Sequence, residues 1–480
     1  MDLPSLRNFR ANKGAYDQWA ELVGDSAFSW DNFLPFLKKS TTIGQPDYSK
    51  RPKNATIDDN PASWLPAGGP LHISWPNWGS PFGTWGMIAL KTIGLIETRD
   101  LNNGVLQGSG WNPFTVNPAA ASRDSSQTSF LQSVKSSNPG KLTVYTHHMA
   151  KKIIFDSNKA AVGVHVNSTD KNRSFVLSAK KEVILSAGAL QSPQMLMVSG
   201  IGPPETLRKF NISILSDLRG VGRNLQDHSM VASTYEVKLE TKSRYWNDPV
   251  YACQADQDYN QHQAGILTCP TGPIAFEKLT TNSSIQMSNS TKAIVNRAFS
   301  KDWPEIEYLI GDTIPDMDPK DGKNYASILT ALVAPTSKGS VTISSADAND
   351  PPIFDFAMLE NDADQELLLN GFKRTRAVWG ALSNITIGVE TFPGPGVKTD
   401  AQILAFLRDT VSTVWHATST CTMGKRTDPG AVIDSHARVY GVNRLRVVDA
   451  SALPFMPAGH PQSSIYALAE KISEDIISGQ

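Results

Sequence analysis

The chain has 480 residues, of which 40% are hydrophobic and 19% are charged, a composition that excludes a disordered protein. The 45 Lys and Arg residues are balanced by 46 Asp and Glu residues and form no basic stripe, which argues against nucleic-acid binding. No apolar stretch approaches the roughly 20 residues that a membrane span needs.

Cysteines and glycosylation sequons bear on the compartment. Cys253, Cys269 and Cys421 lack C-x-x-C spacing, which argues against a structural zinc site; a Cys253–Cys269 disulfide and unpaired thiols are the alternatives. The N-x-S/T sequons permit a secreted glycoprotein, but the first residues show no signal peptide. The sequence therefore leaves the compartment open. The sequons begin at Asn54, Asn167, Asn172, Asn211, Asn282, Asn289 and Asn384.

The chain is expected to begin with helices. Residues 1–40 are rich in aromatic side chains and predict a helical segment. Residues 41–125 predict mostly loops, because Pro, Gly and Trp follow one another quickly, as in "WLPAGGPLHISWPNWGSPFG". The runs between 141 and 186 are short and β-rich ("KLTVYTHHMAKKIIFD", "AAVGVHVNS", "RSFVLSAKKEVILSAG"). They predict consecutive strands of one sheet.

The stretch "KKEVILSAGALQSPQMLMVSGIG" predicts a strand followed by a helix. The strand ends at Leu185, and we expect Ser192 to cap the helix, Pro193 to be its first residue and Gly200 to end it. Small residues at the end of a strand allow a ligand to approach the backbone, as in open α/β sheets. A tight turn without a ligand is the alternative.

The rest of the chain alternates strand-like and helical runs. "YASILTALVAP" and "GSVTIS" predict strands, and "DADQELLLNGFKRTRAVWGAL" predicts a helix. Near the end, the strand "LRVVDAS" is followed by a loop and by "SSIYALAEKISEDII", whose apolar residues recur at helical spacing. This order predicts an α/β domain that is split along the sequence by an insertion.

Two loop histidines are candidates for acid–base chemistry. His416 lies in "VSTVWHATSTCTMG", where a buried structural histidine is the alternative. His460 lies between a strand that ends near Asp449 and the mouth of the last helix. Histidine is the side chain best suited to move protons near neutral pH. Trp415 and Phe455 hint at an aromatic-lined site, although either residue could equally belong to the core.

Together these stretches resemble the glucose–methanol–choline (GMC) family of flavoprotein oxidoreductases, over essentially the whole chain. "GALQSPQMLMVSGIG" resembles the second signature of the family, and "GVGRNLQDH" resembles its usual continuation. "WHATSTCTMG" resembles the segment with the first active-site histidine. "RVYGVNRLRVVDASALPFMPAGHPQSSIYALAEKI" resembles the closing segment. The sequence "HATSTC" resembles the corresponding segment of fungal family members from secondary-metabolite pathways.

The resemblance implies a fold that combines α/β and α+β parts. A split α/β domain would bind FAD, and an interleaved substrate domain built on a β-sheet and helices would cover the flavin. The FAD-binding domain would comprise residues 1–40, 116–228 and 435–480, and the substrate domain and loops residues 41–115 and 229–434. Such an enzyme transfers a hydride from a small-molecule alcohol to the flavin.

The resemblance also implies roles for individual residues. His416 would accept the alcohol proton, and His460 would hold or polarise the substrate oxygen, which eases hydride departure. Other positions match family contacts to the phosphate, ribityl, isoalloxazine and adenine parts of FAD. These positions are Asn8, Ala150, Asp449, Ala450, Pro461 and Gln462.

One family feature is not found. Family members begin with a βαβ unit carrying G-x-G-x-x-G, which seats the pyrophosphate on a helix N-terminus, and no such pattern occurs here. "PSLRN" (Pro4 to Asn8) resembles the tail of the family's G-G-S-S-x-x-N stretch. We therefore expect that a unit of roughly a hundred residues is missing, either because the sequence is an incomplete gene model or isoform, or because the protein is a remnant.

Three functional readings follow from the resemblance. The leading one is an FAD-dependent alcohol oxidase or dehydrogenase. The second is a non-redox lyase or cyclase on the same fold, in which the histidines perform acid–base chemistry. The third is a truncated protein that does not bind FAD. The sequence does not identify the substrate, the electron acceptor or the oligomeric state.

Overall fold

The computed structural model describes residues 7–55, 57, 60–65, 68–98, 100–169, 173–313 and 320–480. Pro4 to Leu6 and the sequon residue Asn172 lie outside these ranges, as does the side chain of Asn54. None of the three cysteines forms a disulfide, so the unpaired alternative holds in this structure. No helix within the described ranges has the length and apolarity to cross a membrane.

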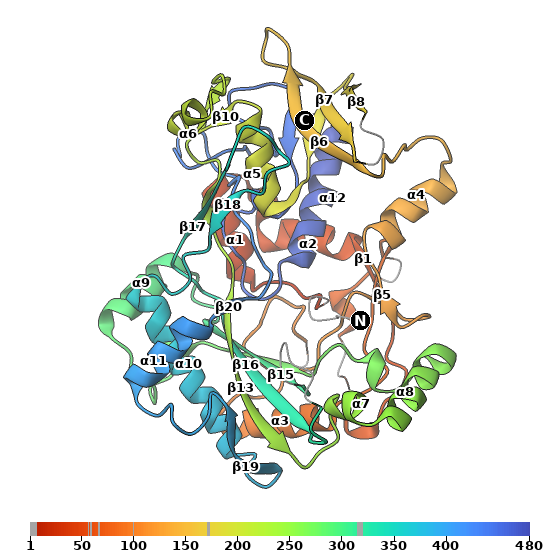
Figure 1. Ribbon diagram of the computed structural model, residues 1–480, viewed down its shortest axis with the longest axis vertical. Helices are drawn as coiled ribbons and strands as arrows, with labels where there is room; N and C mark the ends of the chain where they lie inside the picture. The colour runs from red at the N-terminus through yellow and green to blue at the C-terminus, as the bar shows by residue number, and fades with distance from the viewer. Residues whose placement is uncertain are drawn as a thin grey trace.

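A seven-stranded antiparallel sheet organises the lower part of the molecule (Figure 1). Its strand order is β19-β13-β16-β15-β14-β3, and β20 pairs with the start of β13. Nearly all residues of its central strands are buried, which fits their apolar sequences. The strands are β3 (Gly108–Gly110), β13 (Ser229–Val237), β14 (Ile274–Glu277), β15 (Ile306–Gly311), β16 (Tyr325–Leu332), β19 (Thr386–Phe392) and β20 (Ser412–Thr413).

Helix α10 (Asp362–Gly380) packs on this sheet and confirms the helix predicted there. Asn361 caps its first turn by accepting a hydrogen bond from the backbone of Asp364. Gly371 lets the helix approach closely, because a Cβ at that position would lie 2.8 Å from the side chain of Ile306. Helices α3 (Pro81–Thr92) and α11 (Asp400–Thr410) lie beside it (Figure 1).

A short parallel pair of strands lies in the upper part of the molecule. β9 (Val183–Leu185) pairs with β21 (Leu445–Val447), although the two are far apart in the sequence. β9 leads into α5 (Gly188–Val198), and the loop after β21 leads into α12 (Gln462–Ser478). This pair confirms the predicted α/β segment that is split along the chain.

The predicted strands between 141 and 186 are only partly correct. β6 (His148–Phe155), β7 (Ala161–Ser168) and β8 (Ser174–Ser178) form one antiparallel sheet, as expected. β9, however, belongs to the parallel pair and not to this sheet. Residues 142–147 form no strand: His147 accepts a backbone hydrogen bond from Thr169, but no described strand forms a ladder with this segment.

The predicted start of α5 is wrong. The helix begins at Gly188, so Ser192 and Pro193 lie inside it. Pro193 has no N–H to donate to the carbonyl of Ala189, and the Thr420 hydroxyl donates to that oxygen instead, at 2.6 Å. The helix ends at Val198, and Gly200 follows with a φ of 89°.

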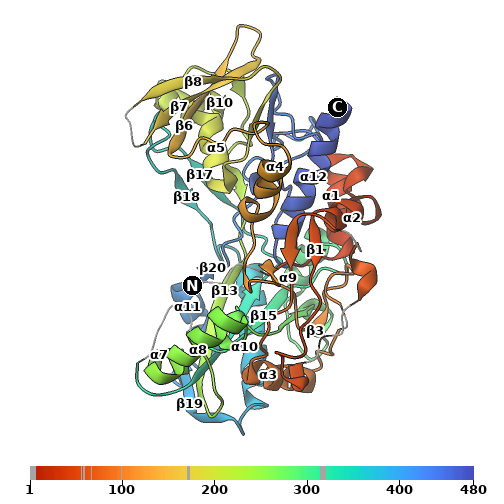
Figure 2. The same cartoon turned by 90° about the vertical axis from the view of Figure 1, so that its right-hand side faces the viewer.

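Helices α1 (Lys13–Val23), α2 (Trp30–Lys39) and α12 pack side by side (Figure 2) and confirm the helices predicted before residue 40 and near the end of the chain. Trp19, Phe28 and Phe33 pack against one another between them. Helix α3 interrupts the region predicted as mostly loops. The remaining elements are β1 (Thr41–Ile43), β2 (Leu71–Ile73), β4 (Val116–Asn117), β5 (Ser122–Arg123), α4 (Gln132–Ser137), β10 (Ile201–Gly202), α6 (Pro204–Lys209), β11 (Ser216–Asp217), β12 (Arg223–Leu225), α7 (Ser243–Asn247), α8 (Pro249–His262), α9 (Asn289–Ala298), β17 (Gly339–Thr342) and β18 (Ile353–Asp355).

Candidate active site

Three buried histidines meet where the large sheet approaches the N-terminus of α12. His228 immediately precedes β13, His416 follows β20, and His460 lies two residues before α12. The ring centroids of His416 and His460 are 4.4 Å apart, and those of His228 and His416 are 5.2 Å apart. The structure thus brings together the two histidines that the sequence singled out and adds a third.

His416 is held through both its backbone and its ring. Its N–H donates to Oδ1 of Asp227 at 3.0 Å, and its Nδ1 lies 3.1 Å from Nδ1 of His228. The β13–β20 pairing, which includes Ser229 opposite Thr413, ties the two segments together next to these contacts. The histidine therefore sits on a braced loop.

His460 is held by a carboxyl group on the large sheet. Its Nε2 lies 3.1 Å from Oε1 of Glu307, the second residue of β15, and both side chains are buried. Phe9 packs against the ring of His460, with centroids 4.9 Å apart. Arg7 is also buried, and its guanidinium donates to Oγ1 of Thr271 and to the carbonyl of Gly272.

Each of the two predicted histidines keeps one ring nitrogen available. No described residue forms a hydrogen bond with Nε2 of His416 or with Nδ1 of His460. The opposite nitrogen of each ring is engaged, by His228 and by Glu307 respectively. This arrangement leaves two imidazole nitrogens for a substrate oxygen and its proton.

Burial sets the charge state of the cluster. It lowers the pKa of His228, His416 and His460 well below the usual value, and the neighbouring histidines or Arg7 lower it further. Burial also raises the pKa of Glu307 to about 8, although the Arg7 charge opposes this shift. The three imidazoles are therefore neutral at pH 7, as a proton acceptor must be.

Asp449 joins the ends of the two parallel strands. Its Oδ2 accepts from the backbone N–H of Gly188 at 2.9 Å and from the Ser192 hydroxyl at 2.5 Å. Its Oδ1 accepts from the N–H of Ser451 at 2.8 Å and from its hydroxyl at 2.5 Å. The buried carboxylate thus fixes the turn before α5 against the loop after β21.

The other residues that the resemblance assigned to FAD are spread over three places. Asn8 lies beside Gln462, whose Oε1 accepts from its amide at 3.4 Å, and Pro461 precedes Gln462 at the start of α12. Ala450 follows Asp449, and its carbonyl accepts from the N–H of Ser419. Ala150 lies apart from these residues, on β6.

The residues around Asp449 fit a dinucleotide cofactor. The residues that directly precede α5 and α12, Ala187 and Pro461, supply no side-chain cap, and Asp449 accepts from the first N–H of α5. A Cβ placed on Gly188, which has a φ of 84°, would meet no described atom within 4 Å. Open space beside the backbone of Gly188, at the carboxyl ends of the parallel strands, allows a cofactor to approach closely.

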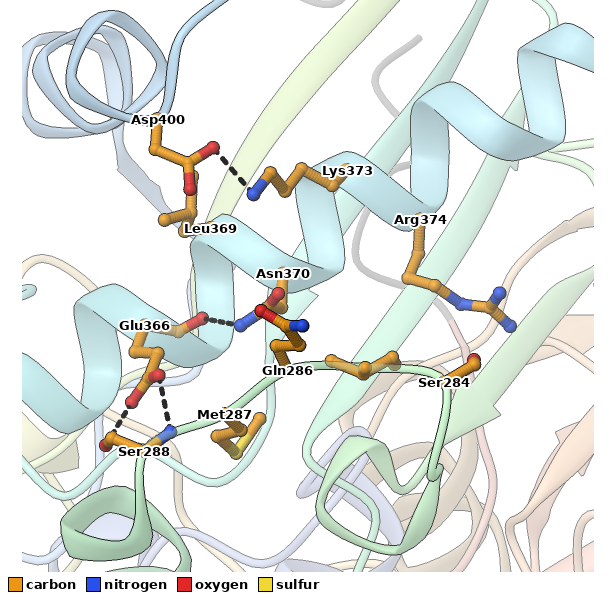
Figure 3. A pocket seen from close by; sticks show the side chains of 11 residues that line it. Ser284, Gln286, Met287, Ser288, Glu366, Leu369, Asn370, Lys373, Arg374 and Asp400 are labelled. Atoms are coloured by element: carbon orange, nitrogen blue, oxygen red, sulfur yellow. Dashed lines mark hydrogen bonds and ion pairs between the residues drawn. The ribbon is translucent and has the colours of Figure 1, made fainter.

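A separate surface hollow of about 760 Å³ lies between residues 284–288 and α10 (Figure 3). Its charged groups are already paired, because Glu366 accepts from Ser288 and Lys373 pairs with Asp400. None of the three histidines lines it. We therefore do not place the catalytic site in this hollow.

The two aromatic residues beside the histidines differ in their surroundings. Trp415 is 57% exposed and has a φ of 60°, so it does not belong to the core. Phe455 packs against the buried Trp303, with ring centroids 5.4 Å apart. Trp415 therefore lies at the surface, next to the buried His416.

Sequence reasoning missed the roles of His228, Glu307 and Arg7 in building the site. His228 ends the motif "GVGRNLQDH", and its position directly before a strand was an available signal. Glu307 was visible as an acidic residue within the otherwise apolar run of β15. Arg7 gave no sequence signal.

Comparisons with known proteins identify the class to which this architecture belongs. Models of the N- and C-terminal parts of the GMC oxidoreductases match residues 5–230 and 335–469. The dehydrogenase pkfF of Emericella nidulans is 44% identical over 98% of this chain and 77% of its own length. Patulin synthase of Penicillium expansum is 43% identical over 98% of this chain and 76% of its own length.

A solved structure gives the same result. An FAD-dependent oxidoreductase from Chaetomium thermophilum superimposes with a TM-score of 0.87 and 25% identity, over 99% of this chain and 84% of that one. The chain belongs to the GMC oxidoreductase family and is an oxidoreductase. The cofactor of this family is FAD, as the sequence motifs predicted.

Proposed function

We propose that the protein oxidises the CH–OH group of a small-molecule alcohol, with His416 as the proton acceptor and His460 as its partner. FAD, when bound, supplies the acceptor for the hydride that leaves the alcohol carbon. The alcohol proton passes to Nε2 of His416, while His460 donates a hydrogen bond to the substrate oxygen. The names of two relatives, a dehydrogenase and a synthase, agree with oxidation within a fungal biosynthetic pathway.

The observation that carries this proposal is the pattern of engaged and free nitrogens. His416 and His460 each have one nitrogen fixed by a buried neighbour and the other free of hydrogen bonds from described residues. Their rings are 4.4 Å apart, so a single oxygen atom can be reached from both. The low pKa values keep the free nitrogen of His416 ready to take a proton.

The Asp449 network and the N-termini of α5 and α12 are the proposed cofactor contacts. Asp449 and Ala450 would face the phosphate and ribityl portion, and Pro461 and Gln462 would place backbone groups beside the flavin ring. Ala150 would meet the adenine, and Asn8, through Gln462, would brace the start of α12. We assign these contacts to the ranges 1–40, 116–228 and 435–480.

We also propose that a βαβ dinucleotide-binding unit outside the described residues completes this domain. Two apolar segments support the proposal. Leu142, Val144 and Tyr145 are about half exposed and unpaired, and Ile184, in the middle of β9, is 47% exposed. Exposed apolar segments of this kind are normally covered by another part of a protein. Such a unit would add the pyrophosphate seat that the sequence lacks.

A non-redox lyase or cyclase would use the same histidines, so the test must measure whether an electron acceptor is reduced as product forms. We expect purified protein supplied with FAD to convert a primary alcohol to its aldehyde with one equivalent of acceptor reduced. Product formed without consumption of an acceptor would favour the non-redox alternative. Absence of bound flavin would contradict FAD binding by this chain, and the assay would be repeated with a βαβ unit added upstream.

Glu307 provides a pH signature for the site. Its pKa of about 8 means that the carboxyl group is protonated in the folded protein at pH 7. We expect kcat/KM to fall about tenfold per pH unit above pH 8, because ionised Glu307 would oppose negative charge on the substrate oxygen. In Glu307→Gln this decline should vanish, which pH–rate profiles from pH 6 to 10 would show.

The same ionisation affects stability with a defined sign. The folded-state pKa is raised above the ordinary value of 4.5, so the contribution of Glu307 is fully present below pH 4.5 and is lost as the pH rises through 8. Glu307→Gln should flatten the fall in unfolding free energy over this range. An unchanged slope would show that Glu307 does not titrate near pH 8.

A further inference from the structure

We propose that His228 is a positioning residue that fixes the tautomer of His416 by accepting a hydrogen bond from Nδ1–H of His416. This inference rests on the proposed role of His416 and deepens it. It concerns a residue that touches neither the substrate oxygen nor the flavin in the arrangement proposed above.

The contact between the two rings requires one proton between them. Nδ1 of His228 lies 3.1 Å from Nδ1 of His416, and the rings are nearly perpendicular, at 83°. Two bare nitrogens would repel each other through their lone pairs, and two N–H groups through their protons. One ring must therefore donate and the other accept.

The need for a base decides which ring donates. If His228 donated, neutral His416 would carry its proton on Nε2 and would offer no lone pair to the substrate. If His416 donates from Nδ1, its Nε2 bears the lone pair. After Nε2 takes up a proton, the same Nδ1–H···N bond persists, so proton uptake requires no rearrangement.

The surroundings of Nε2 of His228 support a role of this residue in positioning His416. Nε2 of His228 is buried and has no hydrogen-bond partner within the described ranges. An unsatisfied buried N–H destabilises the folded protein, and an apolar side chain would avoid this cost. The position therefore keeps a histidine at a cost in stability, which the contact with His416 explains.

The backbone around His228 places both active loops relative to each other. The carbonyl of His228 accepts from the N–H of Val414 at 3.1 Å, and Asp227 accepts from the N–H of His416. Gln226 exchanges backbone hydrogen bonds with Thr418, and its side-chain oxygen accepts from Met456 at 3.1 Å. Residues 226–228 thus connect the loop of His416 with the segment that leads to His460.

Several titratable groups surround this contact. His460 and Asp227 lie next to His416, and Glu307 and Arg7 lie beyond His460. Burial raises the pKa of Asp227 to about 6, although hydrogen bonds from Thr413 and from backbone N–H groups oppose the shift. A pH profile alone would not separate these ionisations, so the test must observe the protonation of the two His416 ring nitrogens directly.

Long-range ¹H–¹⁵N NMR of protein labelled with [¹⁵N]histidine provides this view. We expect His416, assigned by the loss of its signals in His416→Gln, to show a protonated Nδ1 and an unprotonated Nε2 at pH 7. A His416 protonated on Nε2 in the native protein would overturn the proposal. This result requires no variant of His228 to fold.

A matched pair of variants adds a kinetic test. His228→Asn keeps an oxygen acceptor near the place of Nδ1, and His228→Leu fills a similar volume without one. We expect His228→Leu to lower kcat about 10–100-fold with KM changed less than threefold, and His228→Asn to restore most of the loss. His262→Leu, at the exposed end of α8, is the control.

The outcomes separate this inference from the proposed function. If His416→Gln is inactive while His228→Leu keeps the native kcat and the native His416 tautomer, the positioning role is wrong and the proposed function stands. If His416→Gln retains native activity, the proposed function itself fails. Equal losses in His228→Leu and His228→Asn, with an unchanged tautomer, would indicate a purely structural role and would also overturn the inference.

Discussion

Replacing His416 with alanine is expected to lower kcat by about 10²–10⁴-fold while FAD stays bound. General-base catalysis contributes a factor of this size, and Nε2 of this residue is the acceptor that we propose for the alcohol proton. The ring is buried and held by His228, so its removal takes away the base without exposing the Asp449 network. Stopped-flow measurement of flavin reduction, together with flavin content per chain, would check both parts.

The control for this change is His262→Ala, which removes an exposed histidine at the end of α8. The control should keep the native kcat and flavin content. A His416→Ala protein that reduces flavin at the native rate would show that another group takes the proton. A colourless His416→Ala protein would show instead that His416 supports cofactor binding, contrary to the assignment.

Replacing Asp449 with alanine is expected to abolish FAD retention and to destabilise the fold by at least about 3 kcal/mol. The change leaves four donors without their acceptor: the N–H of Gly188, the Ser192 hydroxyl, and the N–H and hydroxyl of Ser451. Each buried unsatisfied donor costs about 1–3 kcal/mol, and local relaxation recovers part of the total. Denaturant unfolding and the visible spectrum would measure the two effects.

Glu21→Ala is a suitable control, because Glu21 is an exposed acidic residue on α1. It should change the unfolding free energy by less than about 0.5 kcal/mol. The unfolding free energy and flavin content of Asp449→Asn should lie between those of the native protein and of Asp449→Ala. The asparagine keeps one acceptor for Ser451 but turns an amide N–H₂ toward Gly188 and Ser192. Native stability and flavin content in Asp449→Ala would contradict the role given to this carboxylate.

Helices α10 and α12 were predictable because their signals are local. The apolar spacing of α12 and the length of the α10 run both lie within one segment of sequence, and packing agrees with them. The failed strand at 142–147 has a strong local β signal, but a strand exists only where a partner pairs with it. Ser192 and Pro193 look like a helix start, yet Asp449 and Thr420, which are distant in sequence, supply the bonds that keep them inside α5.

Only the site residues that lie in recognisable sequence motifs could be predicted. His416, His460 and Asp449 lie in sequence motifs that resemble those of the GMC family. The structure places the two histidines together and Asp449 at the end of a strand. His228 and Glu307 depend on the register of the large sheet, in which Ser229 pairs with Leu332 and Leu332 with Ile306. No local pattern encodes this register, so the sequence could mark these two residues as unusual but could not reveal which histidine each one contacts.

We propose that this chain binds FAD and uses it to oxidise an alcohol at the histidine cluster. The most direct test is the visible absorption spectrum of the purified 480-residue protein, recorded without oxygen before and after addition of primary alcohols. We predict a flavin spectrum that bleaches with the native protein and not with His416→Ala. A protein that forms product from an alcohol while its flavin stays oxidised would contradict the claim.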